Sequence, residues 1–175
     1  MNLKEICKKI LITILLLNVD YILSKFEIPL LDNRIIIRFT FIVGMLYACY
    51  FNIWWCIAFG ILGDVVPFLL FPPSYPFFVG YTISAAIKMA VYRYFLYPDK
   101  VHFRDSIACR LCVNTLINML LGSLWIYMMY HDSSSLYLGS TLFKNLLLTP
   151  LEAMVFYVLY LGIDKLLLMI KSQDH

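Results

Sequence analysis

Six long apolar runs dominate the chain, and they constrain its fold more than any other feature. A helix of about 20 apolar residues is long enough to cross the hydrocarbon core of a bilayer. Only 14% of the residues are charged, against about 25% in an average soluble domain. The sequence therefore predicts an all-α integral membrane protein, with six transmembrane helices in one bundle that forms a single domain over residues 1–175. The predicted spans are residues 6–26, 35–51, 53–70, 77–97, 105–130 and 140–171.

Helix-breaking residues separate these runs. The segment Pro72-Pro73-Ser74-Tyr75-Pro76 cannot continue a helix, because proline lacks a backbone N–H and fixes φ. Asn52 alone separates the second run from the third, which predicts a tight turn there. β-Strands are not expected, because the runs are continuously apolar, whereas the strands of a membrane barrel alternate polar and apolar residues. The first run is interpreted as a retained helix, since no small-residue cleavage site follows it.

Positively charged residues gather on one side of the predicted bundle. Lys/Arg-rich connections stay in the cytoplasm, so both termini are predicted to be cytoplasmic in a multi-pass protein of the cell membrane. The opposite, outward connections hold only Lys25 and Arg34. The cytoplasmic set is Lys4, Lys8, Lys9, Arg93, Lys100, Arg104, Lys165 and Lys171.

The sequence lacks the patterns on which most enzymes depend. It contains no phosphate-binding loop, no H-E-x-x-H motif and no G-x-S-x-G motif. His102, His131 and His175 are far apart, so no metal site is predicted. Cys109 and Cys112 have the C-x-x-C spacing but lie in an apolar helix, and we interpret them as small buried residues. We therefore expect no enzymatic activity and no cofactor. We also expect no nucleic-acid partner, because the net charge of +3 is small.

Several polar residues stand inside the predicted spans. A charge at the bilayer centre costs about 2.5–3.5 kcal/mol, so such residues are expected to face the bundle interior. Asp64 and Lys88 lie on the adjacent third and fourth helices, where they either form a structural ion pair or line a ligand cavity. Glu152 could equally pair within the bundle. The full set is Asp20, Arg38, Asp64, Lys88, Asn114, Asn118, Lys144 and Glu152.

Arg34, Arg38 and Lys144 place positive charge toward the outer side, against the orientation bias. Each cation alone could be an anchor that extends to the interface, and the nearby aromatic residues could form an interfacial belt. Together they favour an outward-facing pocket for a planar aromatic ligand that carries carboxylates. The rings would stack on the ligand, and arginine would bind its carboxylates. The aromatic residues concerned are Phe68, Phe71, Tyr75, Phe77, Phe78, Tyr81, Trp125, Tyr127 and Tyr130.

The stretch that opens the fourth predicted helix carries a family resemblance. It runs from Tyr75 to Ala86 as Tyr-Pro-Phe-Phe-Val-Gly-Tyr-Thr-Ile-Ser-Ala-Ala, and it follows Gly63-Asp64 in the third helix. These segments resemble the substrate-binding membrane subunits (S components) of energy-coupling-factor (ECF) vitamin transporters, folate family. Further similar segments are Ile28-Pro29, Ile37-Arg38-Phe39, residues 118–125 and residues 144–152.

The resemblance implies a six-helix membrane subunit that binds a folate-like vitamin and works with a transmembrane coupling subunit and ATPase subunits. Combined with the pocket argument, it predicts that Arg38 binds the carboxylate end of the ligand, with Lys144 assisting. Asp64 would serve the polar edge of the ring or hold Lys88 in place. Lys88 departs from the family pattern, in which this position is small or neutral. The predicted ligand-binding residues are Arg34, Arg38, Asp64, Tyr75, Phe78, Tyr81, Lys88, Asn118, Trp125 and Lys144.

Two alternatives remain open from the sequence. The chain could be an S component for a different vitamin. It could also be a structural scaffold subunit of the rod-shape-determining MreD type, which is similarly small and apolar. A scaffold would not need cations that face an outward aromatic pocket, so the sequence favours a solute-binding subunit.

Overall fold

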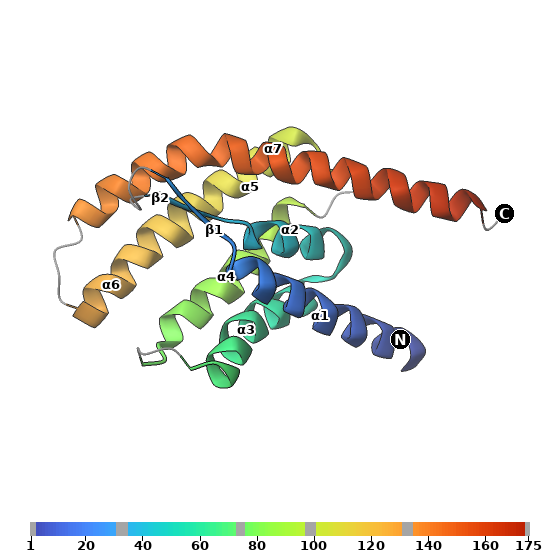
Figure 1. Cartoon of the computed structure of the whole chain (residues 1–175), viewed down its shortest axis with the longest axis horizontal. Helices are drawn as coiled ribbons and strands as arrows, with labels where there is room; N and C mark the ends of the chain where they lie inside the picture. The colour runs from blue at the N-terminus through green and yellow to red at the C-terminus, as the bar shows by residue number, and fades with distance from the viewer. Residues whose placement is uncertain (1–2, 31–34, 73–75, 97–100, 131–134, 174–175) are drawn as a thin grey trace.

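Helices make up most of the computed structural model, which describes residues 3–30, 35–72, 76–96, 101–130 and 135–173. A short hairpin separates the first helix from the second, and the last helix is the longest (Figure 1). In chain order the elements are α1 (Leu3–Ser24), β1 (Glu27–Leu30), β2 (Ile35–Arg38), α2 (Thr40–Tyr50), α3 (Ile53–Leu70), α4 (Val79–Phe95), α5 (Phe103–Cys112), η1 (Val113–Leu121), α6 (Gly122–Tyr130) and α7 (Ser135–Gln173).

The elements α5, η1 and α6 form one continuous helix. Cys112 and Gly122, which flank the π-helical segment η1, both have right-handed helical backbone angles. The Gly122 N–H donates to the Ile117 carbonyl, five residues back, as in a π-helix. The helix begins at Phe103, two residues before the predicted start, because the Asp105 carboxylate accepts a hydrogen bond from the His102 backbone N–H at 3.0 Å and caps it.

Each predicted apolar run overlaps one helical rod in the described part of the chain, but α1 begins three residues before its predicted start and α7 begins five residues before its own. Among the described residues, three helical stretches are long and apolar enough to cross a membrane: Ile53–Leu70, Phe103–Met129 and Leu147–Leu166. The third predicted span agrees with α3 at both ends. At the start of α3 the Asn52 side chain accepts a hydrogen bond of 3.1 Å from the Trp55 N–H and caps the helix.

The expectation that the chain has no strands is wrong for residues 27–38. β1 and β2 pair as an antiparallel hairpin, with Glu27 opposite Arg38 and Leu30 opposite Ile35. The run Ile35-Ile36-Ile37 is β-branched, which favours strand over helix. Consequently α2 begins at Thr40 instead of Ile35, and it has only 11 residues. A short apolar run suits a strand and a helix equally, so its periodicity could not separate the two.

The helices α3 and α4 share the most extensive helix–helix contact in the described residues. Gly60 permits this contact, because a Cβ there would lie 2.5 Å from the Ala85 carbonyl oxygen. One helical turn beyond Gly60 comes Asp64, and one turn on either side of Ala85 come Thr82 and Lys88. The close packing therefore brings the polar residues of the two helices together.

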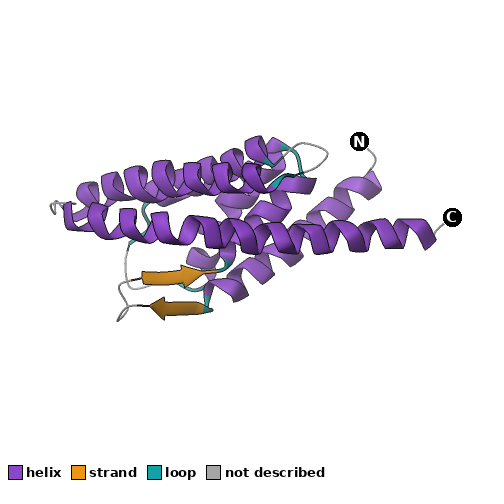
Figure 2. Ribbon diagram, turned by 90° about the horizontal axis from the view of Figure 1, so that it is seen from above, coloured by secondary structure: helices purple, strands orange, loops and turns teal. Residues whose placement is uncertain are grey.

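The long helix α7 runs along the whole molecule, with α5 packed against it (Figure 1). The start of α1 and the end of α7 lie at the same end, while the end of α6 and the start of α7 lie at the opposite end (Figures 1 and 2). Figure 2 shows the hairpin beside the helices, away from the end with the termini. The core between the helices includes Tyr47, Cys56, Met89, Tyr92, Leu96, Cys109, Val113 and Phe156.

Large apolar side chains cover much of the outer surface. Trp54 is 76% exposed, Leu69 72% and Tyr94 79%. In water such a surface would be unfavourable, but it suits contact with lipid chains.

Candidate functional site

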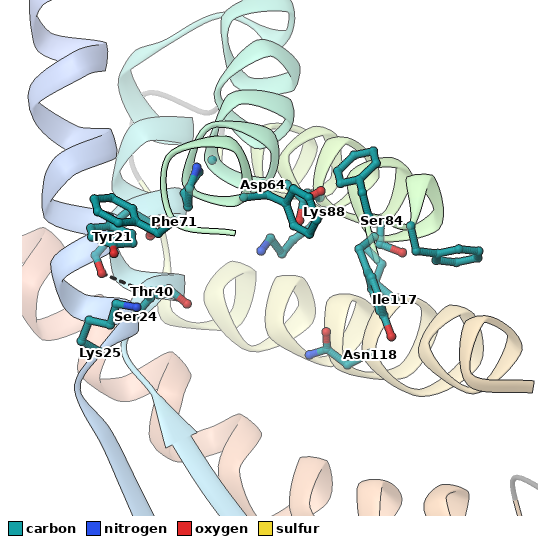
Figure 3. Close-up of a pocket in the computed structure, with 18 of the residues that line it drawn as sticks. Tyr21, Ser24, Lys25, Thr40, Asp64, Phe71, Ser84, Lys88, Ile117 and Asn118 are labelled. Atoms are coloured by element: carbon teal, nitrogen blue, oxygen red, sulfur yellow. Dashed lines mark hydrogen bonds between the residues drawn. The ribbon is translucent and has the colours of Figure 1, made fainter. Parts of the chain in front are cut away.

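A cavity of about 710 Å³ lies among α1, α2, α3, α4 and η1 (Figure 3). This volume falls within the range of about 300–1,000 Å³ that is usual for small-molecule sites. Its wall combines charged, hydroxyl and aromatic groups, as a site for a polar aromatic molecule requires. The lining residues are Asp20, Tyr21, Ser24, Lys25, Thr40, Gly63, Asp64, Pro67, Phe68, Phe71, Phe77, Phe78, Tyr81, Ser84, Ala85, Lys88, Ile117, Asn118 and Met129.

The α3–α4 contact supplies the charged part of the wall. The Thr82 hydroxyl donates a hydrogen bond of 2.5 Å to Asp64 Oδ2, which fixes the orientation of that carboxylate. Lys88 is half-buried, and its ammonium is attracted by the carboxylate of Asp20, which comes from α1, and by that of Asp64, while the Arg110 guanidinium repels it. Both residues that the sequence singled out on these helices, Asp64 and Lys88, therefore line one cavity.

Aromatic rings form the next part of the wall. The Phe78 ring packs edge-on against Tyr81, with centroids 5.7 Å apart, and against Trp125 at 5.6 Å. The Trp125 indole N–H donates to Ser84 Oγ at 2.8 Å, so the α6 ring is tied to α4. Gly80 makes room for this cluster, since a Cβ there would lie 2.8 Å from the Trp125 ring.

Residues at the end of α1, at the start of α2 and just after α3 close the other end of the cavity. Tyr21 stacks on Phe71 with ring centroids 5.1 Å apart, and the Lys25 ammonium lies 4.8 Å from the centre of the Tyr21 ring. Ser24 and Thr40 add hydroxyl groups there, at the end of α1 and the start of α2 (Figure 3). This end therefore offers a cation and hydroxyls beside a stacked aromatic pair.

Five of the predicted ligand-binding residues line the cavity together: Asp64, Phe78, Tyr81, Lys88 and Asn118. Trp125 contacts the wall through Phe78 and Ser84.

The other four predicted positions are less fully described. Arg34 and Tyr75 lie outside the described residues. The structure describes only the backbone of Arg38, in β2, and of Lys144, in α7.

Sequence reasoning did not assign the cavity end formed by Tyr21, Ser24, Lys25 and Thr40. The polar residues at the outer end of the first apolar run could have indicated this part of the cavity. It also overlooked Arg110, which is buried and pairs with Glu152. The four-residue spacing of Arg110, Asn114 and Asn118 places them on one helix face and could have revealed that group.

Comparison with known proteins agrees with the geometry. The family model described as "ECF transporter, substrate-specific component" matches residues 8–160. A crystal structure of FolT bound with folic acid superposes with a TM-score of 0.77 at 30% identity, covering 87% of this chain and 92% of that one.

Two curated proteins called folate transporter FolT are also similar. The protein from Leuconostoc mesenteroides is 27% identical over 152 residues, which are 83% of this chain and 80% of that protein. The protein from Clostridium novyi is 25% identical over 112 residues, 64% of each chain. The family match spans most of the sequence, confirms the resemblance, and places the protein among membrane transport components that are not enzymes. The chain belongs to the substrate-specific components of ECF transporters.

Proposed function

We propose that this chain binds folate, or a closely related vitamin, from outside the cell as the substrate-specific component of an ECF transporter. One observation carries the proposal: a cavity of about 710 Å³ combines aromatic rings with acidic and basic side chains. Folate needs such a site, because its flat pterin ring has polar edges and its glutamate end carries carboxylates. The similar proteins named folate transporters, and the FolT structure with folic acid, support the same ligand class.

The proposed roles follow the two ends of such a ligand. The aromatic ring would pack among Phe78, Tyr81, Tyr75 and Trp125. Asp64 would accept hydrogen bonds from the polar edge of the ring, or it would hold Lys88 in place.

The carboxylate end would meet Arg38, with Lys144 and Arg34 contributing further positive charge. Lys25 adds a cation whose side chain lies at the cavity wall. Arginine suits this role, because its planar fork binds a carboxylate with two hydrogen bonds.

We further propose six transmembrane helices in a single domain over residues 1–175, with both termini in the cytoplasm. The common location of the start of α1 and the end of α7 supports a shared side for the termini (Figure 2). As an S component, the chain would depend on a transmembrane coupling subunit and on ATPase subunits for energy. It would hydrolyse no ATP by itself, and stoichiometric ATP turnover by the purified chain would contradict this proposal.

Calorimetric titration of the detergent-purified chain tests the ligand. Folic acid, 5-formyl-folate and a carboxylate-free pterin should all bind, and the pterin should bind more weakly because it lacks the anionic end. Mass spectrometry of small molecules that co-purify identifies the natural ligand directly. A different co-purified vitamin, with no binding of folic acid, would overturn the folate assignment.

A further inference from the structure

A buried ion pair joins four elements beside the cavity. Arg110 of α5 is only 4% exposed and Glu152 of α7 only 8%. The Arg110 Nε donates to Glu152 Oε2 at 3.1 Å, and Arg110 Nη2 contacts the same oxygen. Arg110 Nη1 donates to the Tyr92 hydroxyl of α4 at 2.8 Å, and the guanidinium carbon lies 4.6 Å from the centre of the Phe41 ring of α2. Contacts from α7, α4 and α2 therefore hold this guanidinium in place.

The ion pair in turn orients the side-chain amide of Asn114. Arg110 Nη2 donates to Asn114 Oδ1 at 3.3 Å. Asn114 Nδ2 donates to Thr149 Oγ1 at 2.8 Å and to Glu152 Oε2 at 3.2 Å. A flipped amide would place its NH₂ group against the Arg110 donor and its oxygen against the Glu152 carboxylate. The buried charges therefore permit only one orientation of Asn114.

Asn114 then orients Asn118, which lines the cavity (Figure 3). Asn118 Nδ2 donates to Asn114 Oδ1 at 2.9 Å. Because that oxygen can only accept, Asn118 must turn its NH₂ group toward Asn114 and its carbonyl oxygen away from it. The oxygen is thereby available to a hydrogen-bond donor on a bound molecule.

The backbone of this segment is held as well. Asn145 of α7 donates from Nδ2 to the Asn114 backbone carbonyl at 2.9 Å. Asn114 and Asn118 both belong to the π-helical segment η1, a rare helical form that often occurs at functional sites. Thus Thr149 and Glu152 of α7 hold the Asn114 side chain, and Asn145 of α7 holds its backbone.

We propose that Arg110 and Glu152 are positioning residues for ligand specificity: through Asn114 they set Asn118 to present an acceptor to the ligand. Neither residue lines the cavity. This inference rests on the proposed function for the identity of the probe, folic acid, whose pterin ring carries N–H donors that an acceptor would select.

A double-mutant cycle on the full chain in detergent tests the relay, with folic acid affinity as the readout. The double variant Arg110→Met/Glu152→Met removes both charges together, since removing one would leave the other buried and unpaired. It should lower the affinity about five- to ten-fold, the effect of one hydrogen bond. In the Asn118→Ala background the same double change should have no further effect, because the acceptor that it positions is gone.

Asn114→Leu provides a second test in case the charge-free double variant fails to fold. It interrupts the relay while the Arg110–Glu152 pair remains, and it should give the same loss, again absent with Asn118→Ala. Tyr47→Phe is the matched control. It removes the similarly buried hydrogen bond between Tyr47 and Thr13, of 2.8 Å, outside the relay, and should leave the affinity unchanged.

The outcomes separate the two proposals. Losses that persist at full size in the Asn118→Ala background would show a general structural role and overturn the relay. Unchanged affinity in Asn114→Leu would overturn it too. Wild-type protein that does not bind folic acid would overturn the proposed ligand and the relay together, whereas wild-type binding without coupling overturns the relay alone.

Discussion

Gly60 of α3 lies so close to Ala85 of α4 that a Cβ on Gly60 would stand 2.5 Å from the Ala85 carbonyl oxygen. Real Cβ atoms do not approach backbone oxygen so closely, and neither backbone can move without separating the two helices. The contact lies one helical turn from Asp64 and from Lys88. The geometry of the charged cavity wall thus depends on a residue that has no side chain.

Gly60→Ala should destabilise the protein by about 1–3 kcal/mol, the usual cost of inserting a group into a packed core. The folic acid affinity should fall as well, because α3 and α4 must separate. Gly162→Ala in α7 is the matched control, since nothing lies within 4 Å of a Cβ there; it should be neutral or stabilise by up to about 1 kcal/mol. Thermal unfolding in detergent and calorimetry measure both effects. Equal stability of the two variants would contradict the close-packing argument.

Asp64→Ala should weaken folic acid binding about 10-fold or more, because a hydrogen bond to a charged group contributes about 1.5–3 kcal/mol. Thr82→Val should have a smaller effect, since it leaves the carboxylate in place and removes only the hydroxyl that orients it. Calorimetry on both variants checks this order. If Thr82→Val is the more damaging of the two, Asp64 does not bind the ligand.

Arg38→Ala should weaken the binding of intact folate about 10- to 150-fold, which corresponds to the loss of about 1.5–3 kcal/mol. Arg38→Lys should also weaken it, because the charge remains but the two-pronged fork is lost. A carboxylate-free pterin is the control ligand, and its affinity should not change. Wild-type affinity of Arg38→Ala for intact folate would remove Arg38 from the site.

The membrane orientation can be measured by cysteine labelling in a cysteine-free background. Ser134→Cys, in the connection before α7, should react with an impermeant reagent in intact cells. Gln173→Cys, at the end of α7, should react only after the membrane is opened. The reverse pattern would place the termini outside the cell.

The helical architecture was predictable because composition leaves a chain like this little choice. Runs as apolar as Ile53–Leu70 must lie in lipid or in a core, and Asn52 and Pro72 mark where they stop. The hairpin was not predictable, because residues 35–38 are apolar and β-branched, and their partner residues 27–30 include Pro29, which is unusual in a strand. Proline is tolerated there, since each strand of a two-stranded sheet has a free edge.

The site was predictable in part for a similar reason. Asp64 and Lys88 stand out because charge is costly inside an apolar run, and the same argument indicated Asn118. Arg110 was overlooked because it falls within the first turns of its helix, where a cation could equally extend to the interface. Only the three-dimensional structure shows that it points inward, to Glu152.

The shortness of α2 has a consequence for how a ligand would reach the cavity. Its 11 residues rise about 16 Å at about 1.5 Å per residue, roughly half of a hydrocarbon core of about 30 Å. In the proposed six-span arrangement, the remaining depth would fall to the β1–β2 hairpin, whose outer edges carry backbone groups that cannot face lipid chains unpaired. In that arrangement water would have to reach down along the hairpin toward Thr40 and Lys25, which line the cavity. A charged ligand would enter along this hydrated path and would not cross the hydrocarbon core of the bilayer.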